Sequence, residues 1–229
     1  MNNAASLPSE FKRFPCEFRR MVRSDLPHVL EIEGRAFRLP WSEERFLEAI
    51  GSQGDFTPVT VEIAGKQAAA PAKRATGKKL IGYFVLGLKT RSMHLANLAI
   101  HPEHRRRGYA SQCLAIVAQL ASRAAELARQ GSTFKAIAGG FQPAALRDVA
   151  ASQAPSAGSE WDASTEEERV DPNEGDIYLE VEESNLPAQL LYRKMGFRAT
   201  RILRNYYPSL REDGYHMARK ISAPREAAP

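Results

Sequence analysis

The sequence predicts a single α/β domain in which strands and helices follow one another along 229 residues. Three observations favour this class. The length suits one well-buried domain, and hydrophobic (43%) and charged (26%) fractions are ordinary for a folded protein. Short runs rich in β-branched and aromatic residues predict strands. Runs with apolar residues three and four positions apart predict helices, and no internal repeat is evident.

The N-terminal part begins with a polar stretch, residues 1–17, which we expect to be a mobile leader. A first strand is expected over 18–25, with Asp25 capping a helix formed by LPHVLEIEGRAF. Ser42 in PWSEERFLEAI is expected to begin a second helix, because the two glutamates after it suit the positive end of a helix dipole.

Three strands are expected in the centre of the chain: PVTVEI (58–63), KLIGYFVLGLK (79–89) and HLANLAI (94–100). The first two are joined by a long loop, 64–78. From Ala110 the apolar spacing predicts an amphipathic helix. The segment HRRRGYAS therefore connects a strand to a helix.

Composition changes after this helix. Residues 139–175 are rich in alanine, serine, proline and acid, and we expect a mostly disordered insertion there. Between Gly140 and Asp176 the net charge is −7, so the remainder of the chain carries +12. Such a body would attract phosphates, acidic protein tails or RNA.

The C-terminal part returns to regular patterns. DIYLEVEE predicts a strand whose two faces differ, with Glu180 on the less apolar one. Ser184 or Asn185 is expected to cap a helix that ends at Gly196. FRATRILRNYY and GYHMARKI predict two closing strands, and residues 221–229 form a tail.

Several classes of protein are disfavoured. Cys16 and Cys113 make neither a disulfide framework nor a metal-ligand cluster, so we expect no metal and take Cys113 as a core residue. His101 and His104 remain unassigned. The start of the chain lacks a signal-peptide core, and no apolar run approaches the roughly 18 residues that span a bilayer. We expect a cytoplasmic protein with neither membrane nor DNA partners.

The arginine turn between strand and helix suits an anion. The first N–H groups of a helix point outward at its positive end, and a glycine lets the backbone approach a phosphate closely. Three arginines add charge-assisted hydrogen bonds. A solvated surface or a nucleic-acid patch remains the alternative. G-x-G-x-x-G and Gly-Lys-Ser/Thr motifs are absent, which disfavours a dinucleotide-binding fold and excludes a Walker-type loop.

LEVEESNLPAQLLYRKMGF (179–197) resembles the GNAT superfamily of acetyl-CoA-dependent N-acetyltransferases, and within it the RimI-type ribosomal-protein-alanine N-acetyltransferases. RRRGYA matches the family's R/Q-x-x-G-x-G/A loop, with alanine at the last position, and LANLAI its preceding strand. RNYYP and AFRLPWSEERF match its terminal and early segments. The likeness covers about 18–130 and 176–220, which implies one acetyltransferase domain over 18–220.

The resemblance implies a central, mostly antiparallel sheet, flanked by helices, that splits at the strand before the arginine turn. Acetyl-CoA would occupy the split as cosubstrate. Its pantetheine arm would pair with backbone of Leu98, Ala99 and Ile100, and Asn185 would be a further contact. The pyrophosphate would lie on the arginine turn and the start of the helix: Arg105, Arg106, Arg107, Gly108, Tyr109, Ala110 and Ser111.

Acetyl transfer to an amine needs a proton acceptor for the amine and benefits from a proton donor for the departing thiolate. Glu180 and Tyr192 are the candidates, and the resemblance implies these roles for them. A tyrosine is protonated at neutral pH, whereas a glutamate is a weak base unless burial raises its pKa or it works through water. The alternatives are a solvated strand charge and a core tyrosine.

An α-amine has a pKa of about 8 and a lysine about 10.4, so a modest base such as Glu180 suits an α-amine better. By resemblance the acceptor would be the N-terminal alanine of the eighteenth protein of the small ribosomal subunit, met through transient association with the ribosome. Trp41, Tyr206 and Tyr207 are candidates for lining its groove, with simple packing as the alternative.

Two other functions stay open. The same chemistry could act on protein lysines, a polyamine or an aminoglycoside, which an acid-lined acceptor site would favour. A non-catalytic ribosome- or RNA-binding module on the same fold is permitted by the +12 body. The chain lacks the aromatic and basic pattern of an RNA-recognition sheet.

Overall fold

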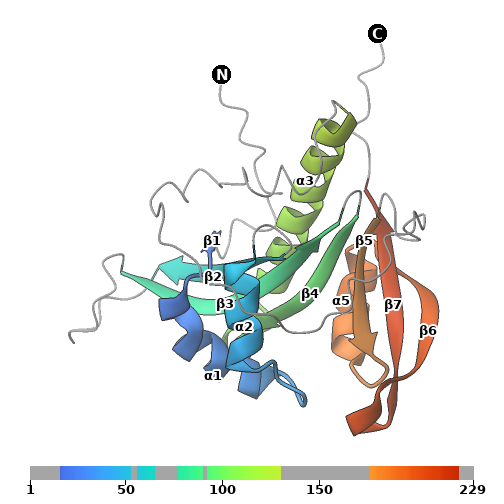
Figure 1. Cartoon of the computed structure of the whole chain (residues 1–229), viewed down its shortest axis with the longest axis horizontal. Helices are drawn as coiled ribbons and strands as arrows, with labels where there is room; N and C mark the ends of the chain where they lie inside the picture. The colour runs from blue at the N-terminus through green and yellow to red at the C-terminus, as the bar shows by residue number, and fades with distance from the viewer. Residues whose placement is uncertain (1–15, 53–55, 65–76, 90–91, 130–175, 222–229) are drawn as a thin grey trace.

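The structure is a computed structural model that describes residues 16–52, 56–64, 77–89, 92–129 and 176–221 (Figure 1). The expected insertion at 139–175, most of the 64–78 loop and nearly all of the tail lie outside the described residues. Within the described ranges, none of the helices combines the length and apolar character that a membrane crossing requires.

Seven strands form one sheet in the order β1-β2-β3-β4-β5-β7-β6 (Figure 1). Neighbouring strands are antiparallel except β4 and β5, which are parallel. This confirms the expected α/β domain with a mostly antiparallel sheet. The strands are β1 (Glu17–Arg20), β2 (Phe56–Ala64), β3 (Lys78–Leu88), β4 (Met93–Ile100), β5 (Asp176–Glu182), β6 (Arg198–Tyr207) and β7 (Glu212–Lys220).

The sheet splits between β4 and β5, as the resemblance implies. The two strands pair only at Met93 with Ile177 and at His94 with Tyr178, although β4 continues to Ile100. The β3–β4 register shifts just beyond this point, so that one extra β4 residue has no partner on β3. Such a bulge bends a strand and increases its twist, which directs β4 away from β5.

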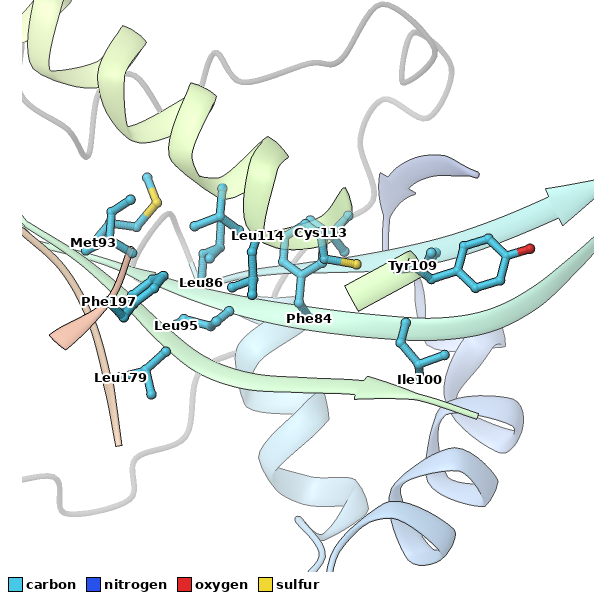
Figure 2. Close-up of a cluster of buried hydrophobic side chains, with 14 of the residues drawn as sticks. Phe84, Leu86, Met93, Leu95, Ile100, Tyr109, Cys113, Leu114, Leu179 and Phe197 are labelled. Carbon is cyan, nitrogen blue, oxygen red and sulfur yellow. The ribbon is translucent and has the colours of Figure 1, made fainter. Parts of the chain in front are cut away.

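Four helices among the described residues cover the two faces of the sheet (Figure 1). One hydrophobic cluster joins α1 and α2 to β3, whereas a larger one joins α3 and α5 to β3, β4 and β5. Figure 2 shows α3 placing Cys113 and Leu114 over Phe84 of that larger cluster. Cys113 is fully buried, which confirms it as a core residue. The helices are α1 (Leu26–Ala36), α2 (Glu43–Gly51), α3 (Tyr109–Arg129) and α5 (Leu186–Lys194).

The two expected polar caps of α2 and α5 are present. Ser42 accepts the N–H of Arg45 at 3.4 Å, and Asn185 rather than Ser184 accepts the N–H of Ala188 at 3.3 Å. A short polar side chain at this position satisfies one of the N–H groups that a helix start leaves without an intrahelical acceptor.

The N-terminal boundary differs from the expected one. The first strand ends at Arg20 rather than Asp25, and a 3-10 turn over Arg23–Asp25 leads into α1. Asp25 occupies the N-cap position of α1 but makes no cap bond, because its carboxylate is held by Arg19 at 2.6 Å. Cys16, expected in the leader, is buried, and its Sγ donates to Gln112 Oε1 at 3.2 Å.

Candidate active site

The split leaves backbone groups of β4 facing away from β3. Ala99 pairs with β3 in the antiparallel ladder, and His101 N–H donates to the carbonyl oxygen of Ile81 at 2.8 Å. Because backbone groups alternate in direction along a strand, those of Ala99 point to β3, whereas those of Leu98 and Ile100 point into the split. Of the three residues expected to pair with a pantetheine arm, two are oriented to do so and Ala99 is not.

The arginine turn, residues 105–108, connects β4 to α3 beside this open edge. Arg106 and Gly108 both adopt positive φ, at 63° and 83°. A Cβ at Gly108 would meet nothing within 4 Å, so glycine is favoured there by the backbone conformation rather than by crowding. The turn is exposed, as a surface that receives a phosphate must be.

The start of α3 supplies N–H groups at the same place. The first helical hydrogen bond runs from Gln112 N–H to Gly108 O at 3.0 Å, so the N–H groups of Ala110 and Ser111 precede it. They lie at the positive end of a 21-residue helix. This arrangement fits an anionic group such as a pyrophosphate.

Three residues assigned to the same ligand also have structural contacts. Arg105 Nε donates to the carbonyl oxygen of Ile100 at 3.0 Å, which fixes the turn to the end of β4. The Tyr109 side chain is buried in the larger hydrophobic cluster, so only its backbone belongs to the turn. The side-chain oxygen of Asn185 accepts the N–H of Ala188 and so caps α5.

Glu180 forms a pair that the sequence interpretation missed. Its Oε2 lies 2.6 Å from Nε2 of His94, and the two side chains are 16% and 27% exposed. The short parallel pairing of β4 with β5 brings them together at the point where the strands separate. An ionised carboxylate can only accept, so His94 Nε2 carries the proton and donates it.

A stack of rings holds His94 in place. The His94 ring lies 4.7 Å from the Tyr178 ring at an angle of 9°, and Tyr178 lies 5.5 Å from His216 at 23°. His216 is directly opposite Glu180 in the β5–β7 ladder, and its Nδ1 lies 2.6 Å from Thr200 Oγ1. Stacking restricts rotation of the imidazole and keeps its Nε2 directed at Glu180.

Opposing effects set the pKa of Glu180. Burial disfavours the charged form and raises the pKa, whereas the hydrogen bond and charge of His94, and then the charge of His216, lower it. The lowering effects prevail, so the pKa lies below its usual value. Burial therefore does not make Glu180 a stronger base, and the carboxylate is ionised at neutral pH.

Tyr192 lies on the face of the sheet opposite to Glu180 and packs against the larger hydrophobic cluster. It lies on α5, which packs on the side of β5 opposite to Glu180, and its ring is 5.8 Å from Phe197. Burial raises the pKa of Tyr192 to about 12, so its hydroxyl keeps its proton at neutral pH. After burial and Tyr206, the charges of Glu182, Glu180 and Tyr192 all raise the pKa of Tyr207.

Tyr206 and Tyr207 form the C-terminal end of β6. Their rings meet edge to face at 5.1 Å, above Gly214 of β7. A Cβ at Gly214 would lie 3.2 Å from the Tyr207 ring, so the glycine allows this close approach. Burial first, and then the charge of Glu180, raise the pKa of Tyr206, while Arg45 lowers it.

Trp41 lies on the α1–α2 connection together with Arg45. The Arg45 guanidinium is 4.1 Å from the centre of the Trp41 ring, and Phe46 packs on the same ring at 5.4 Å. The charge of Arg45 also lowers the pKa of Tyr206.

A buried carboxylate, also missed from the sequence, fixes the Trp41 backbone. Glu33 on α1 is 1% exposed and accepts the N–H of Trp41 at 2.7 Å and Nδ2 of Asn97 at 3.3 Å. The hydroxyl of Tyr83 donates to its other oxygen. Burial raises the pKa of Glu33 to about 7, although the Trp41 and Asn97 hydrogen bonds oppose the shift.

The raised pKa of Glu33 predicts a pH-dependent stability. Its folded pKa of about 7 exceeds the ordinary 4.5, so its favourable contribution is complete below pH 4.5 and is lost as pH rises towards 7. Glu33→Gln, which mimics the protonated acid, should remove this dependence. From pH about 4 to about 8, the wild-type unfolding free energy should fall relative to the variant's by about 2 to 3 kcal/mol in urea titrations. Parallel pH dependences would contradict this.

The two histidines beside the turn differ in their contacts. His101 Nδ1 accepts the N–H of Glu103 at 3.3 Å and so caps the short 3-10 turn over Pro102–His104. His104 is buried, and burial, followed by the charges of Lys79 and Arg107, lowers its pKa. Among the described residues no group of three or more His, Cys, Asp or Glu could hold a metal ion.

Comparisons with known sequences identify similar proteins. The model of the acetyltransferase (GNAT) family matches residues 26–137. An N-alpha-acetyltransferase of Saccharolobus solfataricus is 43% identical over 60 residues, 26% of this chain and 35% of that protein. The match thus spans about a third of the length of this curated relative.

Two solved structures share the fold. The ribosomal-protein-S18-alanine N-acetyltransferase from Escherichia coli superposes with a TM-score of 0.56 at 21% identity, over 94% of this chain and 99% of that chain. The NatC complex bound to Gag peptide and CoA gives a TM-score of 0.53 at 12% identity, over 90% and 99%. At these identities the likeness shows the fold.

Proposed function

Because the chain contains a domain of the acetyltransferase (GNAT) family, we propose that it is an acetyl-CoA-dependent N-acetyltransferase acting on the α-amine at a protein N-terminus. The observation that carries the proposal is the His94–Glu180 pair, 2.6 Å apart where β4 and β5 separate. A proton acceptor at this point lies beside the open edge of β4, whose far end continues into the arginine turn.

The residues around the split fit acetyl-CoA, which supplies the acetyl group as an activated thioester. Backbone groups of Leu98 and the N–H of Ile100 would hold the pantetheine arm, because they point away from β3, whereas the Ile100 carbonyl oxygen accepts from Arg105. The exposed arginines and the N–H groups of Ala110 and Ser111 would hold the phosphates. Ala110 in place of the commoner glycine adds one methyl group near this position.

Three side chains would take part in the chemical steps. Glu180 accepts the proton of the attacking amine, directly or through water, and His94 orients the carboxylate. Tyr192, with a pKa of about 12, holds a proton that it can donate to a thiolate, whose thiol pKa is about 8.5. Acid and base roles of this kind each contribute roughly 10²- to 10⁴-fold.

Two observations support an α-amine as acceptor. Glu180 has a lowered pKa and is a modest base, which suits an amine that is partly neutral at pH 7 better than a lysine. The curated relative is an N-alpha-acetyltransferase, and a structural neighbour modifies the alanine of a ribosomal protein. We extend the proposal to the N-terminal alanine of a small-subunit ribosomal protein, met by transient association with the ribosome.

Other amines form the second candidate. Glu182 lies two residues beyond Glu180 on the same face of β5, and Glu212 is paired with Tyr207. Carboxylates at these positions would favour cationic acceptors such as polyamines or aminoglycosides. A panel of an alanine peptide, an N-blocked lysine peptide, spermidine and an aminoglycoside, with products identified by mass spectrometry, separates the two. Preferred acetylation of the alanine α-amine supports the proposal, and preference for another acceptor overturns it. Salt-dependent RNA binding without any acetylation would indicate a non-catalytic module.

His94→Gln should move the acid limb of the kcat/KM profile to higher pH. Without the imidazole, its hydrogen bond and charge no longer lower the pKa of Glu180, so this pKa rises and the carboxylate is protonated sooner as pH falls. Profiles of wild type and variant from pH about 5 to about 9 measure the shift. A loss by the same factor at every pH, with the acid limb in the same place, would contradict this role of His94.

A further inference from the structure

Three side chains that are far from Arg38 in the sequence offer hydrogen-bond acceptors to its guanidinium. A single nitrogen of its guanidinium, Nη2, lies 3.0 Å from Glu182 Oε2, 2.8 Å from Ser184 Oγ and 2.7 Å from Glu212 Oε1, so its two hydrogens are shared among three acceptors. Ser184 Oγ donates in turn to Glu212 Oε2 at 2.8 Å. We call these four residues the Arg38 clasp.

The clasp joins the connection between α1 and α2 to the end of the β6–β7 ladder that contains Tyr207. Arg38 lies three residues before Trp41, on the connection between α1 and α2. Glu212 is paired with Tyr207 at the start of the β6–β7 ladder. Glu182 is two residues beyond Glu180, hence on the same face of β5. The clasp therefore ties the Trp41 segment to the Tyr207 segment next to the proton acceptor.

The clasp also sets the charge of this region. The Glu182 and Glu212 side chains are 16% and 20% exposed and share one cation, which is itself 49% exposed. The Arg38 hydrogen bond is the main reason that the pKa of Glu212 lies below its usual value, so this carboxylate stays ionised. Nearby Asp213 is paired with Arg204 at 2.6 Å. Without Arg38, two carboxylates would face an incoming acceptor with no matching positive charge.

We infer that Arg38 is a specificity-determining residue, which disfavours acceptors that carry positive charge next to their reacting amine; this rests on the proposed function. It masks Glu182 and Glu212 and presents its own half-exposed guanidinium to the acceptor. Like charges facing each other across a binding surface suppress the wrong partner. Arg38 acts on binding rather than on chemistry, because it touches neither Glu180 nor Tyr192 among its described contacts.

The test compares two peptides that begin with alanine and carry either three lysines or three glutamates at positions two to four. Arg38→Met keeps the aliphatic stem and removes the charge. We expect it to raise the lysine-to-glutamate ratio of kcat/KM by about tenfold, mainly through KM. Adding Glu212→Gln should return the ratio towards wild type. Arg35→Met is the matched control, because Arg35 lies one turn earlier and pairs with Glu31 instead. It should leave the ratio unchanged.

A second readout does not depend on turnover. If the clasp holds residues 37–42 against residues 205–213, Arg38→Met should speed amide hydrogen exchange in both segments, and Arg35→Met should not. If wild type acetylates neither peptide, the proposed function fails, and the same ratio is then measured from peptide dissociation constants by fluorescence anisotropy. An unchanged ratio, unchanged exchange in both segments, or no binding of either peptide overturns the inference.

Discussion

Replacing Glu180 with glutamine is expected to lower kcat/KM for an alanine peptide by roughly 10²- to 10⁴-fold. The change removes the proton acceptor but keeps the size of the side chain and its ability to hydrogen-bond His94. Acetyl-CoA affinity should stay near wild type, because Glu180 lies at the β5 side of the split and the arginine turn at the far end of β4. Steady-state kinetics and calorimetric titration with acetyl-CoA measure the two quantities.

Glu183→Gln is the matched control for this variant. Glu183 follows β5 directly, is exposed, and is held through its backbone N–H, which donates to Asp213 O at 3.1 Å. Its loss should change kcat/KM little. An equal loss in both variants would mean that the net negative charge of the region matters rather than the proton acceptor at position 180.

The second large effect is expected for Tyr192→Phe, which should lower kcat by about 10²-fold or more. Phenylalanine keeps the ring that packs against Phe197, so the fold should be retained, and only the proton donor is lost. An acceptor's amine is unaffected by this change, so the loss should appear in kcat rather than in peptide KM. A peptide assay under saturating acetyl-CoA measures it.

Tyr215→Phe controls for loss of a tyrosine hydroxyl elsewhere. Tyr215 lies on β7 opposite Val181 and packs against the same hydrophobic cluster as Tyr192. It should retain near wild-type kcat. If Tyr192→Phe also retains it, another group or water protonates the leaving thiolate, and the donor assigned from the resemblance is wrong.

Much of the fold follows from local patterns. The expected strands at 58–63, 79–89 and 94–100 differ from β2, β3 and β4 by at most two residues at either end. Strand alternation and helical spacing are properties of adjacent residues, so one sequence reveals them. The boundary at Asp25 was missed because Arg19 competes for its carboxylate, a contact that depends on how β1 meets the following turn.

Some residues of the candidate site could likewise be predicted from local sequence, and others could not. The arginine turn and Glu180 belong to continuous motifs, whereas His94 is separated from Glu180 by 86 residues and Arg38 from Glu182 by 144. Contacts over such distances depend on sheet order, which a single sequence does not contain. A weak signal existed for His94, the polar first residue of an otherwise largely apolar strand, HLANLAI.

Glu33 shows how a polar residue on an apolar face is overlooked. It lies four residues after Val29, so helical spacing places it on the buried stripe of α1. Its partners Trp41, Tyr83 and Asn97 come from three further segments. A glutamate in an amphipathic helix is usually solvated, and only the assembled fold shows that this one is enclosed.

The most direct test of the account is release of free CoA from acetyl-CoA by the wild-type protein, with an alanine peptide and with the same peptide blocked at its N-terminus. The wild-type protein should release CoA with the peptide that has a free α-amine and release none above background with the blocked peptide. Equal release with both would place the acceptor elsewhere than the α-amine. No release with either, despite acetyl-CoA binding measured by calorimetry, would contradict an N-terminal acetyltransferase.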